Sequence, residues 1–252
     1  MEINIKEINY LAKTYSPLDY SSKLAALLSK VYPYLSLESL SRFDLHCLLN
    51  ETLLSKYRGE QIYKYELFQR HLNKKLVAAF EIKINNSRLD FLTIGSHTTS
   101  FEIKSELDNL SKLSKQTADY QLAFEYNYLI VDKCHVQKVL NIIPDCFGLW
   151  SFNDGEYKKV KVASKSDKID PFTQLKLLNK KELTTHFPDV DGCKHRIVCE
   201  FESEIINQKF KEALVSRYKK RWDFVTLHQK SIMPIDIQFF FNTNIQPQFV
   251  YH

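Results

Sequence analysis

Three short strand-like segments, followed by a helix and one more strand, constrain the fold more than any other feature. The segments are KLVAAFEIKIN (75–85), SRLDFLTIG (87–95) and TSFEIKS (99–105), and turn-forming residues separate them. Residues 108–126 then favour a helix, and the apolar run NYLIVD (127–132) suits a strand that is buried on both faces. This order of elements predicts a mixed sheet in an α/β protein.

Helices are expected on both sides of this segment. The first 56 residues place apolar side chains at helical spacing, and a further helix begins near Glu60. After residue 132, the segment FGLWSFNDGEYKKVKVA (147–163) predicts a β-hairpin that turns at Asp154-Gly155. Residues 203–224 predict an amphipathic helix. The aromatic tail, residues 235–252, leaves two alternatives, a last strand or a packed arm.

We therefore predict an α/β fold with a mixed sheet of four or five strands flanked by helices. The chain is long enough for one large domain with additions at both ends. We expect an N-terminal helical region (1–56), a core (57–152), and a C-terminal hairpin and helical extension packed on the core (153–252).

The composition narrows the function. Only 5 glycines occur, and neither GxGxxG nor GxxxxGK[ST] is present, which speaks against a nucleotide-cradling loop. The net charge of +5 and the segment RYKKRW (217–222) suit a polyanionic partner, although such a run is more often a solvated helix face. The 5 cysteines show no CxxC spacing, and no run of 18 apolar residues occurs. These features predict a cytoplasmic protein with reduced thiols and no membrane contact.

Two carboxylates and a lysine on neighbouring strand-like segments point to metal chemistry. Glu102 and Lys104 are two residues apart, so both project from one face of their strand. A tight turn to the preceding strand can bring Asp90 beside them. Two carboxylates and the backbone carbonyl of Ile103 can hold Mg²⁺, which activates water and neutralises charge on a phosphate. Burying both acids without a cation would be unfavourable, because like charges raise each other's pKa.

These residues resemble a known family of enzymes. An aspartate on the second strand and Glu-x-Lys on the third, in an α-β-β-β-α-β order, resemble the PD-(D/E)XK nuclease superfamily. Asp90, Glu102, Ile103 and Lys104 match its motif, whereas Leu89 stands where the family has proline. The resemblance implies a restriction-endonuclease-like core.

Two further matches extend the resemblance. The stretch QTADY, from Gln116 to Tyr120, fits the QxxxY motif of RecB-like and CRISPR-associated nucleases. Glu60 matches the glutamate on the core helix that often assists the metal in this superfamily. The region 60–132 is similar to a bacterial branch that is often found beside mobile elements.

The resemblance implies a metal-dependent phosphodiesterase that uses Mg²⁺ or Mn²⁺ and acts on nucleic acid, with DNA favoured over RNA. It also implies a role in defence against phage or mobile elements, and it leaves open a homodimer, as in restriction-like members. Its site residues would be the metal ligands Asp90, Glu102 and Ile103, the catalytic base or electrophile Lys104, the auxiliary group Glu60, and the substrate-binding residues Gln116, Tyr120 and Arg88.

Alternatives stand beside this reading. Glu102 and Lys104 are also compatible with a surface ion pair worth less than about 1 kcal/mol. The same fold can serve as a catalytically silent module that binds nucleic acid or protein, and a protein-binding role without nucleic acid also fits the modest charge. If the side chains of Asp90, Glu102 and Lys104 converge on one point, the enzyme is favoured over a surface ion pair.

Overall fold

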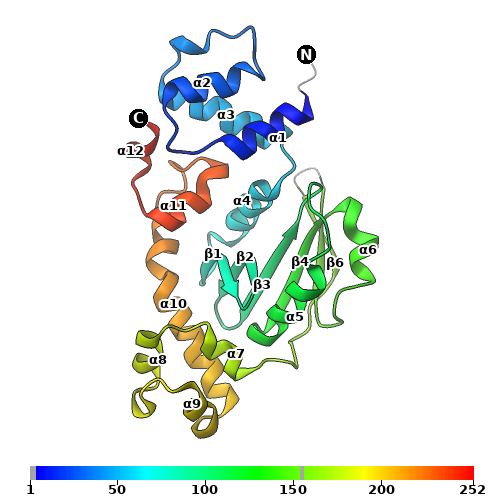
Figure 1. The fold of residues 1–252 in the computed structure, drawn as a ribbon, viewed down its shortest axis with the longest axis vertical. Coiled ribbons are helices and arrows are strands. Elements are labelled where there is room, and N and C mark those ends of the chain that lie inside the picture. The colour runs from blue at the N-terminus through cyan, green and yellow to red at the C-terminus, as the bar shows by residue number, and fades with distance from the viewer. Residues whose placement is uncertain (1–3, 154–155) are drawn as a thin grey trace. The chain divides into compact units, whose positions relative to one another are not determined.

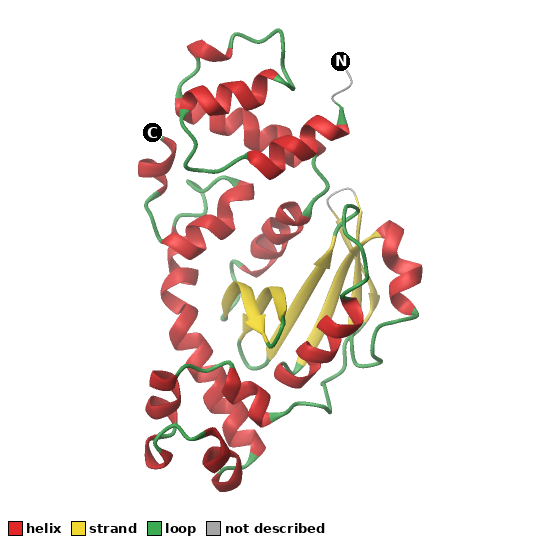
Figure 2. Ribbon diagram, in the orientation of Figure 1, coloured by secondary structure: helices red, strands yellow, loops and turns green. Residues whose placement is uncertain are grey.

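A computed structural model describes residues 4–153 and 156–252 of the chain, and the predicted turn at Asp154-Gly155 lies outside these residues. The chain is a mixed α/β protein (Figures 1 and 2). It divides into two compact units, a helical unit of Met1–Tyr65 with Asp223–His252 and a sheet unit of Glu66–Trp222. The two ends of the chain therefore belong to one unit. In the described residues, no helix is long and apolar enough to cross a membrane.

The helical unit consists of short helices from both ends of the chain. The C-terminal tail is neither the strand nor the arm expected, because it forms helices. Pro234 starts the short helix η4 that leads into α11, and Pro247 starts α12. The elements are α1 (Ile5–Thr14), α2 (Ser21–Ser29), η1 (Leu37–Ser39), α3 (Arg42–Lys56), the start of α4 (Glu60–His71), the end of α10 (Ser203–Leu227), η4 (Pro234–Asp236), α11 (Ile237–Thr243) and α12 (Pro247–Tyr251).

The sheet unit is built on six strands rather than four or five. The order in space is β1-β2-β3-β4-β5-β6, with β3, β4 and β5 parallel to one another and the other neighbours antiparallel. The predicted hairpin at residues 147–163 supplies the last two strands. The strands are β1 (Val77–Ile84), β2 (Ser87–Ile94), β3 (Thr98–Lys104), β4 (Tyr126–Asp132), β5 (Gly148–Asn153) and β6 (Glu156–Lys161).

Helix α5 (Leu113–Ala123) connects β3 to β4 and lies against one face of the sheet (Figure 2). It is shorter than the predicted helix at 108–126. Asp108 does not start this helix, because its carboxylate accepts hydrogen bonds from the backbone N–H and the hydroxyl of Ser105 at 2.8 and 2.6 Å. The remaining elements of this unit are η2 (Lys133–His135), α6 (Val136–Leu140), α7 (Pro171–Lys176), α8 (Lys180–His186), η3 (Pro188–Val190) and α9 (Lys194–Glu200).

Alternation along β3 separates an apolar face from a polar one. Phe101 and Ile103 are buried on the apolar face, where Phe101 packs beside Phe91 of β2 and His71 of α4. Glu102 and Lys104 point to the opposite face, towards α5. The apolar packing fixes the register of the strand, and this register turns both charged residues to one side.

Acidification is expected to destabilise the sheet unit through His71. Its ring lies against Phe91 and Phe101, and Nδ1 is 2.7 Å from the carbonyl oxygen of Leu67. Burial lowers the pKa of His71 to about 4. The neutral ring stabilises the fold fully above pH 6.5, and this contribution, about 3 kcal/mol, is lost as the pH falls from 6.5 towards 4. Urea unfolding followed by tryptophan fluorescence reports this unit, because it holds both tryptophans.

His71→Gln is the comparison variant, because a glutamine does not titrate. We expect its unfolding free energy to be lower than that of the wild type at pH 7 and to depend less on pH between 6.5 and 4. Equal pH dependence in the two proteins would assign the acid sensitivity to other groups.

The basic segment 217–222 has structural roles at both ends. Arg217 of α10 donates from Nε to Glu182 of α8 at 2.7 Å and from Nη2 to the carbonyl of Leu177 at 2.8 Å. Trp222 is buried at 3% exposure. Arg217 therefore links α10 to α8 through its ion pair with Glu182. Contact with a nucleic-acid backbone stays a prediction for the residues in the middle of the segment.

Arg217→Met is expected to destabilise the sheet unit by about 2 kcal/mol. The loss leaves the carboxylate of Glu182, whose side chain is 16% exposed, without its guanidinium partner. The matched control is Arg196→Met, which removes an exposed i,i+4 pair with Glu200 worth about 0.5 kcal/mol or less. Urea unfolding of both variants measures the difference, and equal losses would contradict the assigned role of Arg217.

Candidate active site

Strands β2 and β3 separate at the position of the two predicted metal ligands. Their paired register ends with Phe91 opposite Phe101, so Asp90 and Glu102 are the first residues beyond it. There the side chain of Asp90 replaces the backbone partner, because its Oδ2 accepts the N–H of Ile103 at 2.6 Å. This hydrogen bond satisfies a buried donor that the separating strands would otherwise leave unpaired. It also fixes the Asp90 carboxylate beside β3.

The carboxylate of Glu102 is the centre of a buried hydrogen-bond network. Glu102 is 1% exposed. Its Oε1 accepts from the ammonium of Lys104 at 2.6 Å and from the amide of Gln116, and its Oε2 accepts from the hydroxyl of Tyr120 at 2.7 Å. A buried carboxylate needs such partners, since an unpaired charge in this environment would be very costly. Three predicted site residues thus meet on the fourth.

The spacing of Gln116 and Tyr120 brings both side chains to Glu102. They are four residues apart on α5, so they lie on one face of the helix. The helix is held in place by Asp119, whose carboxylate accepts hydrogen bonds from Ser87 at 2.5 Å and from Asn85 at 3.1 Å. The turn between β1 and β2 therefore sets the position of α5 against the polar face of β3.

Lys104 carries a proton in this arrangement. Burial alone would lower its pKa, but the charge of Glu102, their hydrogen bond and the charge of Asp90 outweigh burial and raise the pKa above its usual range. The ammonium therefore acts here as a hydrogen-bond donor to Glu102, and the catalytic role of Lys104 stays a prediction. Burial and the same two carboxylates raise the pKa of Tyr120, so its phenol also stays a donor.

Glu81 is a third carboxylate that sequence reasoning did not place in the site. In the β1–β2 register it lies opposite Asp90, between two regular pairs, and its φ of 56° is in the left-handed region. A carboxylate oxygen of Glu81 lies within 4.8 Å of one of Asp90. Left-handed backbone is unusual for a glutamate in a strand and costs of the order of 1 kcal/mol or more. No pattern in the sequence signals it, because the alternation of β1 is otherwise regular.

Two further predicted site residues, Arg88 and Glu60, form ion pairs of their own. The side chain of Arg88 is 72% exposed and its guanidinium is 3.4 Å from Glu81, while its backbone carbonyl lies 2.9 Å from the Tyr120 hydroxyl. Contact with a phosphate stays a prediction for this side chain. Glu60 is the first residue of α4 and belongs to the helical unit, where it pairs with Lys64. Its predicted role beside a metal also stays a prediction.

The donor atoms of this site are of the kind that binds divalent cations. Asp90, Glu102 and Glu81 offer carboxylate oxygens, the ligands that Mg²⁺ and Mn²⁺ prefer. The ammonium of Lys104 lies beside Glu102, and the guanidinium of Arg88 lies beside Glu81. In this arrangement that ammonium lies 2.6 Å from Glu102 Oε1, so a cation bound there would have to share or replace its contact. The predicted carbonyl ligand, Ile103, follows directly in the strand.

Comparisons with known proteins identify a family. No curated protein matches the chain. A solved structure, the SPO1766 protein of unknown function from Silicibacter pomeroyi, is similar over 61% of this chain and 84% of its own, with 16% identity and a TM-score of 0.36, too weak a likeness to support an argument. Residues 54–240, well over half of the chain and inclusive of every predicted site residue, match the family described as Bacteriophage P4 protein cII. The chain therefore belongs to the bacteriophage P4 cII protein family.

Proposed function

We propose that the protein is a metal-dependent nuclease that hydrolyses phosphodiester bonds, in DNA rather than RNA. The observation that carries the proposal is the network around Glu102. Lys104, Gln116 and Tyr120 all contact its carboxylate. The carboxylate of Asp90 accepts a hydrogen bond from the backbone N–H of Ile103, the residue that follows Glu102. A surface ion pair does not need buried acids or a helix that supplies two further donors. The interpretation of Glu102 and Lys104 as an ordinary surface ion pair is therefore disfavoured.

The order of elements supports the same proposal at the level of the fold. Helix α4, strands β1 to β3, helix α5 and strand β4 follow one another in the α-β-β-β-α-β order of a restriction-endonuclease-like core. The Asp90 position falls on the second of these strands and the Glu-x-Lys pair on the third. Because one fold serves many functions, this order adds to the geometry of the site but does not replace it.

Each residue has a role in the proposed reaction. Asp90, Glu102 and the Ile103 carbonyl would hold Mg²⁺ or Mn²⁺, with Glu81 as a further donor. The bound metal supplies an activated water and positive charge at the phosphate. Lys104 stabilises negative charge that develops on the phosphate and orients the attacking water. Gln116 and Tyr120 keep the carboxylate of Glu102 in one orientation, since both donate to it.

A silent binding module is the second candidate, and the same network favours it. Both oxygens of Glu102 already accept hydrogen bonds from protein groups, and Lys104 is held as a cation. A site that never binds metal could persist in this closed form. The setting proposed for either candidate is conflict between bacteria and phages or other mobile elements, in line with the name of the family.

Cleavage assays separate the two candidates. Supercoiled plasmid, linear duplex, single-stranded DNA and RNA are incubated with Mg²⁺, Mn²⁺ or EDTA and either wild type or Lys104→Ala. Lys180→Ala, an exposed lysine of α8, is the matched control. Cutting that needs a metal, survives in the control and falls by about 100-fold or more in Lys104→Ala supports the nuclease. Binding in a gel shift without cutting by any protein favours the silent module.

A further inference from the structure

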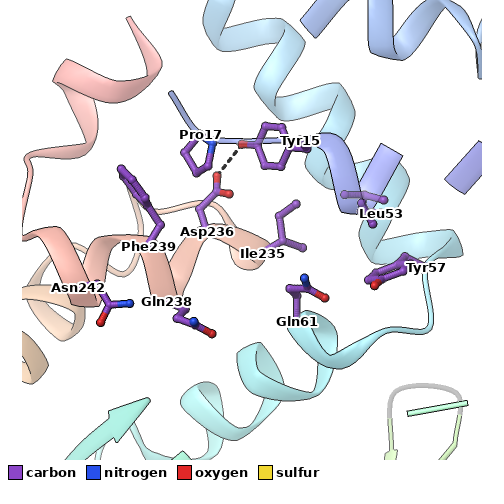
Figure 3. Close-up of a pocket in the computed structure, with 11 residues that line it drawn as sticks. Tyr15, Pro17, Leu53, Tyr57, Gln61, Ile235, Asp236, Gln238, Phe239 and Asn242 are labelled. Atoms are coloured by element: carbon purple, nitrogen blue, oxygen red, sulfur yellow. Dashed lines mark hydrogen bonds between the residues drawn. The ribbon is translucent and has the colours of Figure 1, made fainter. Parts of the chain in front are cut away.

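The helical unit contains a cavity of about 240 Å³ whose lining is mixed polar and apolar. Figure 3 shows the polar side chains gathered around it, with the carboxylate of Asp236, the hydroxyl of Tyr15 and three carboxamides. The apolar part of the wall comes from α1, the loop that follows it, α3, η4 and α11. Small-molecule sites have this mixture of a few polar groups on an apolar wall, and this volume lies just below their range of roughly 300–1,000 Å³. The full lining is Ala12, Tyr15, Pro17, Leu53, Tyr57, Gln61, Ile235, Asp236, Gln238, Phe239 and Asn242.

Asp236 is a buried acid whose hydrogen-bond donors all contact the same carboxylate oxygen. It is 2% exposed, and three donors meet on one of its oxygens. Oδ2 accepts from the hydroxyls of Tyr15 and Tyr251 at 2.9 and 2.8 Å and from the amide of Asn50 at 3.5 Å. The dashed line in Figure 3 marks the first of these bonds, and the second oxygen of the carboxylate lies clear of it. Among the described residues, Oδ1 has no hydrogen-bond donor.

No cation neutralises this acid within the described residues. Its three partners are two phenols and a carboxamide, and the next group in the chain of contacts is His46, whose Nδ1 is 2.9 Å from the Tyr15 hydroxyl. Burial lowers the pKa of His46 to about 4, so the ring is neutral. Lys64 donates to Gln238 at 2.8 Å and pairs with Glu60. A carboxylate buried without a counter-ion is unfavourable unless something else supplies the charge.

The position of Asp236 in its helix adds to this point. It is the N-cap of α11, where an aspartate ordinarily accepts a hydrogen bond from the start of the helix. Here the side chain makes no such bond and turns instead to Tyr15 and Tyr251. The acid is therefore not explained by capping, and its free oxygen lines the cavity.

We propose that this cavity binds a small organic cation, with a primary ammonium or guanidinium group at Oδ1 of Asp236. The carboxamides of Gln61, Gln238 and Asn242 offer further hydrogen bonds to its N–H groups, and its apolar part lies against the walls. Neutral polar ligands cannot form an ion pair with the carboxylate of Asp236, and this carboxylate repels anions. The cation has two sources, a free amine or guanidine and the lysine or arginine side chain of a peptide.

Titration calorimetry with the full chain at pH 7 tests the proposal. The probes are putrescine, agmatine and a Gly-Arg-Gly peptide, with 1,4-butanediol as the neutral control. We expect the cations to bind at least tenfold more tightly than the diol. Because burial raises the pKa of Asp236 to about 7, binding of a cation should also release protons, seen as a heat that depends on the buffer. The affinity of the peptide, compared with that of putrescine and agmatine, shows whether the cavity binds a peptide side chain or a free cation.

Three variants locate the binding. Asp236→Asn keeps the acceptor for the two phenols, and we expect it to weaken binding of the cations by tenfold or more and to abolish proton release. Asn242→Leu changes an exposed part of the lining and should also weaken binding. Gln248→Leu, an exposed carboxamide of α12 that is not part of the lining, is the matched control. Equal binding of the diol, unchanged binding in both lining variants, or no binding of any probe at millimolar concentration would each overturn the proposal.

Discussion

Asp90→Asn is expected to reduce metal-dependent cleavage by about 100-fold or more while it preserves or raises stability. The asparagine keeps an oxygen for the Ile103 N–H, so the separated ends of β2 and β3 remain joined. It removes one of the buried negative charges near Glu102, which lessens the repulsion between the two carboxylates. Active sites commonly trade stability for function in this way. We expect an increase in unfolding free energy of up to about 1 kcal/mol.

Metal binding gives this prediction a second measurement. Mn²⁺ or Mg²⁺ should raise the melting temperature of the wild type, because a ligand that binds only the folded state stabilises it. In Asp90→Asn this shift should be largely lost. Asp189→Asn, an exposed aspartate in η3, is the matched control and should retain both cleavage and the shift. Cleavage by Asp90→Asn at the rate of the wild type would remove Asp90 from the metal site.

These two measurements also separate the candidate functions. A silent module that still binds a metal would show the melting shift without cleavage, and Asp90→Asn would remove the shift alone. A silent module that has lost the metal would show neither. The nuclease requires both cleavage and the shift in the wild type.

Asp236→Asn is expected to stabilise the helical unit at pH 8 by up to about 4 kcal/mol and to leave its stability at pH 4 nearly unchanged. Burial raises the pKa of Asp236 from 3.8 to about 7. The contribution of the protonated acid to stability is complete below the unfolded pKa of 3.8 and is lost as the pH rises from there to about 7. An asparagine does not titrate, so the variant does not pay this penalty. A cation bound in the cavity would reduce the difference at pH 8.

The measurement is urea unfolding of both proteins at pH 4, 6 and 8. Far-UV circular dichroism is required because both tryptophans lie in the sheet unit. His46, in the same unit, acts with the opposite sign, since its lowered pKa removes stability as the pH falls from 6.5 to 4. We therefore expect the helical unit of the variant to be more sensitive to acid than that of the wild type. Equal stability of the two proteins at pH 8 would show that ionised Asp236 does not destabilise the helical unit.

Much of the sheet unit is predictable from short-range patterns. Alternating side chains in residues 77–104 and the turns between them identify β1, β2 and β3, and helical spacing identifies α4 and α10. The start of α5 was misplaced because Asp108 closes a turn with Ser105 instead of capping the helix. The strand order, β1 to β6 in sequence, depends on long-range pairing, which no local pattern encodes.

Local sequence patterns were enough to select the residues of the candidate site, which are Asp90, Glu102 and Lys104 on neighbouring strands, with Gln116 and Tyr120 one helical turn apart. Their spacing alone is enough to place them on common faces, because strands and helices have fixed periods. Other features of the site depend on how the chain packs. Tertiary structure alone separated β2 from β3 at Asp90, brought α5 onto Glu102, turned Glu81 into a left-handed conformation and enclosed Asp236. Each of these depends on contacts between residues far apart in the chain, and such contacts form only when the whole core packs.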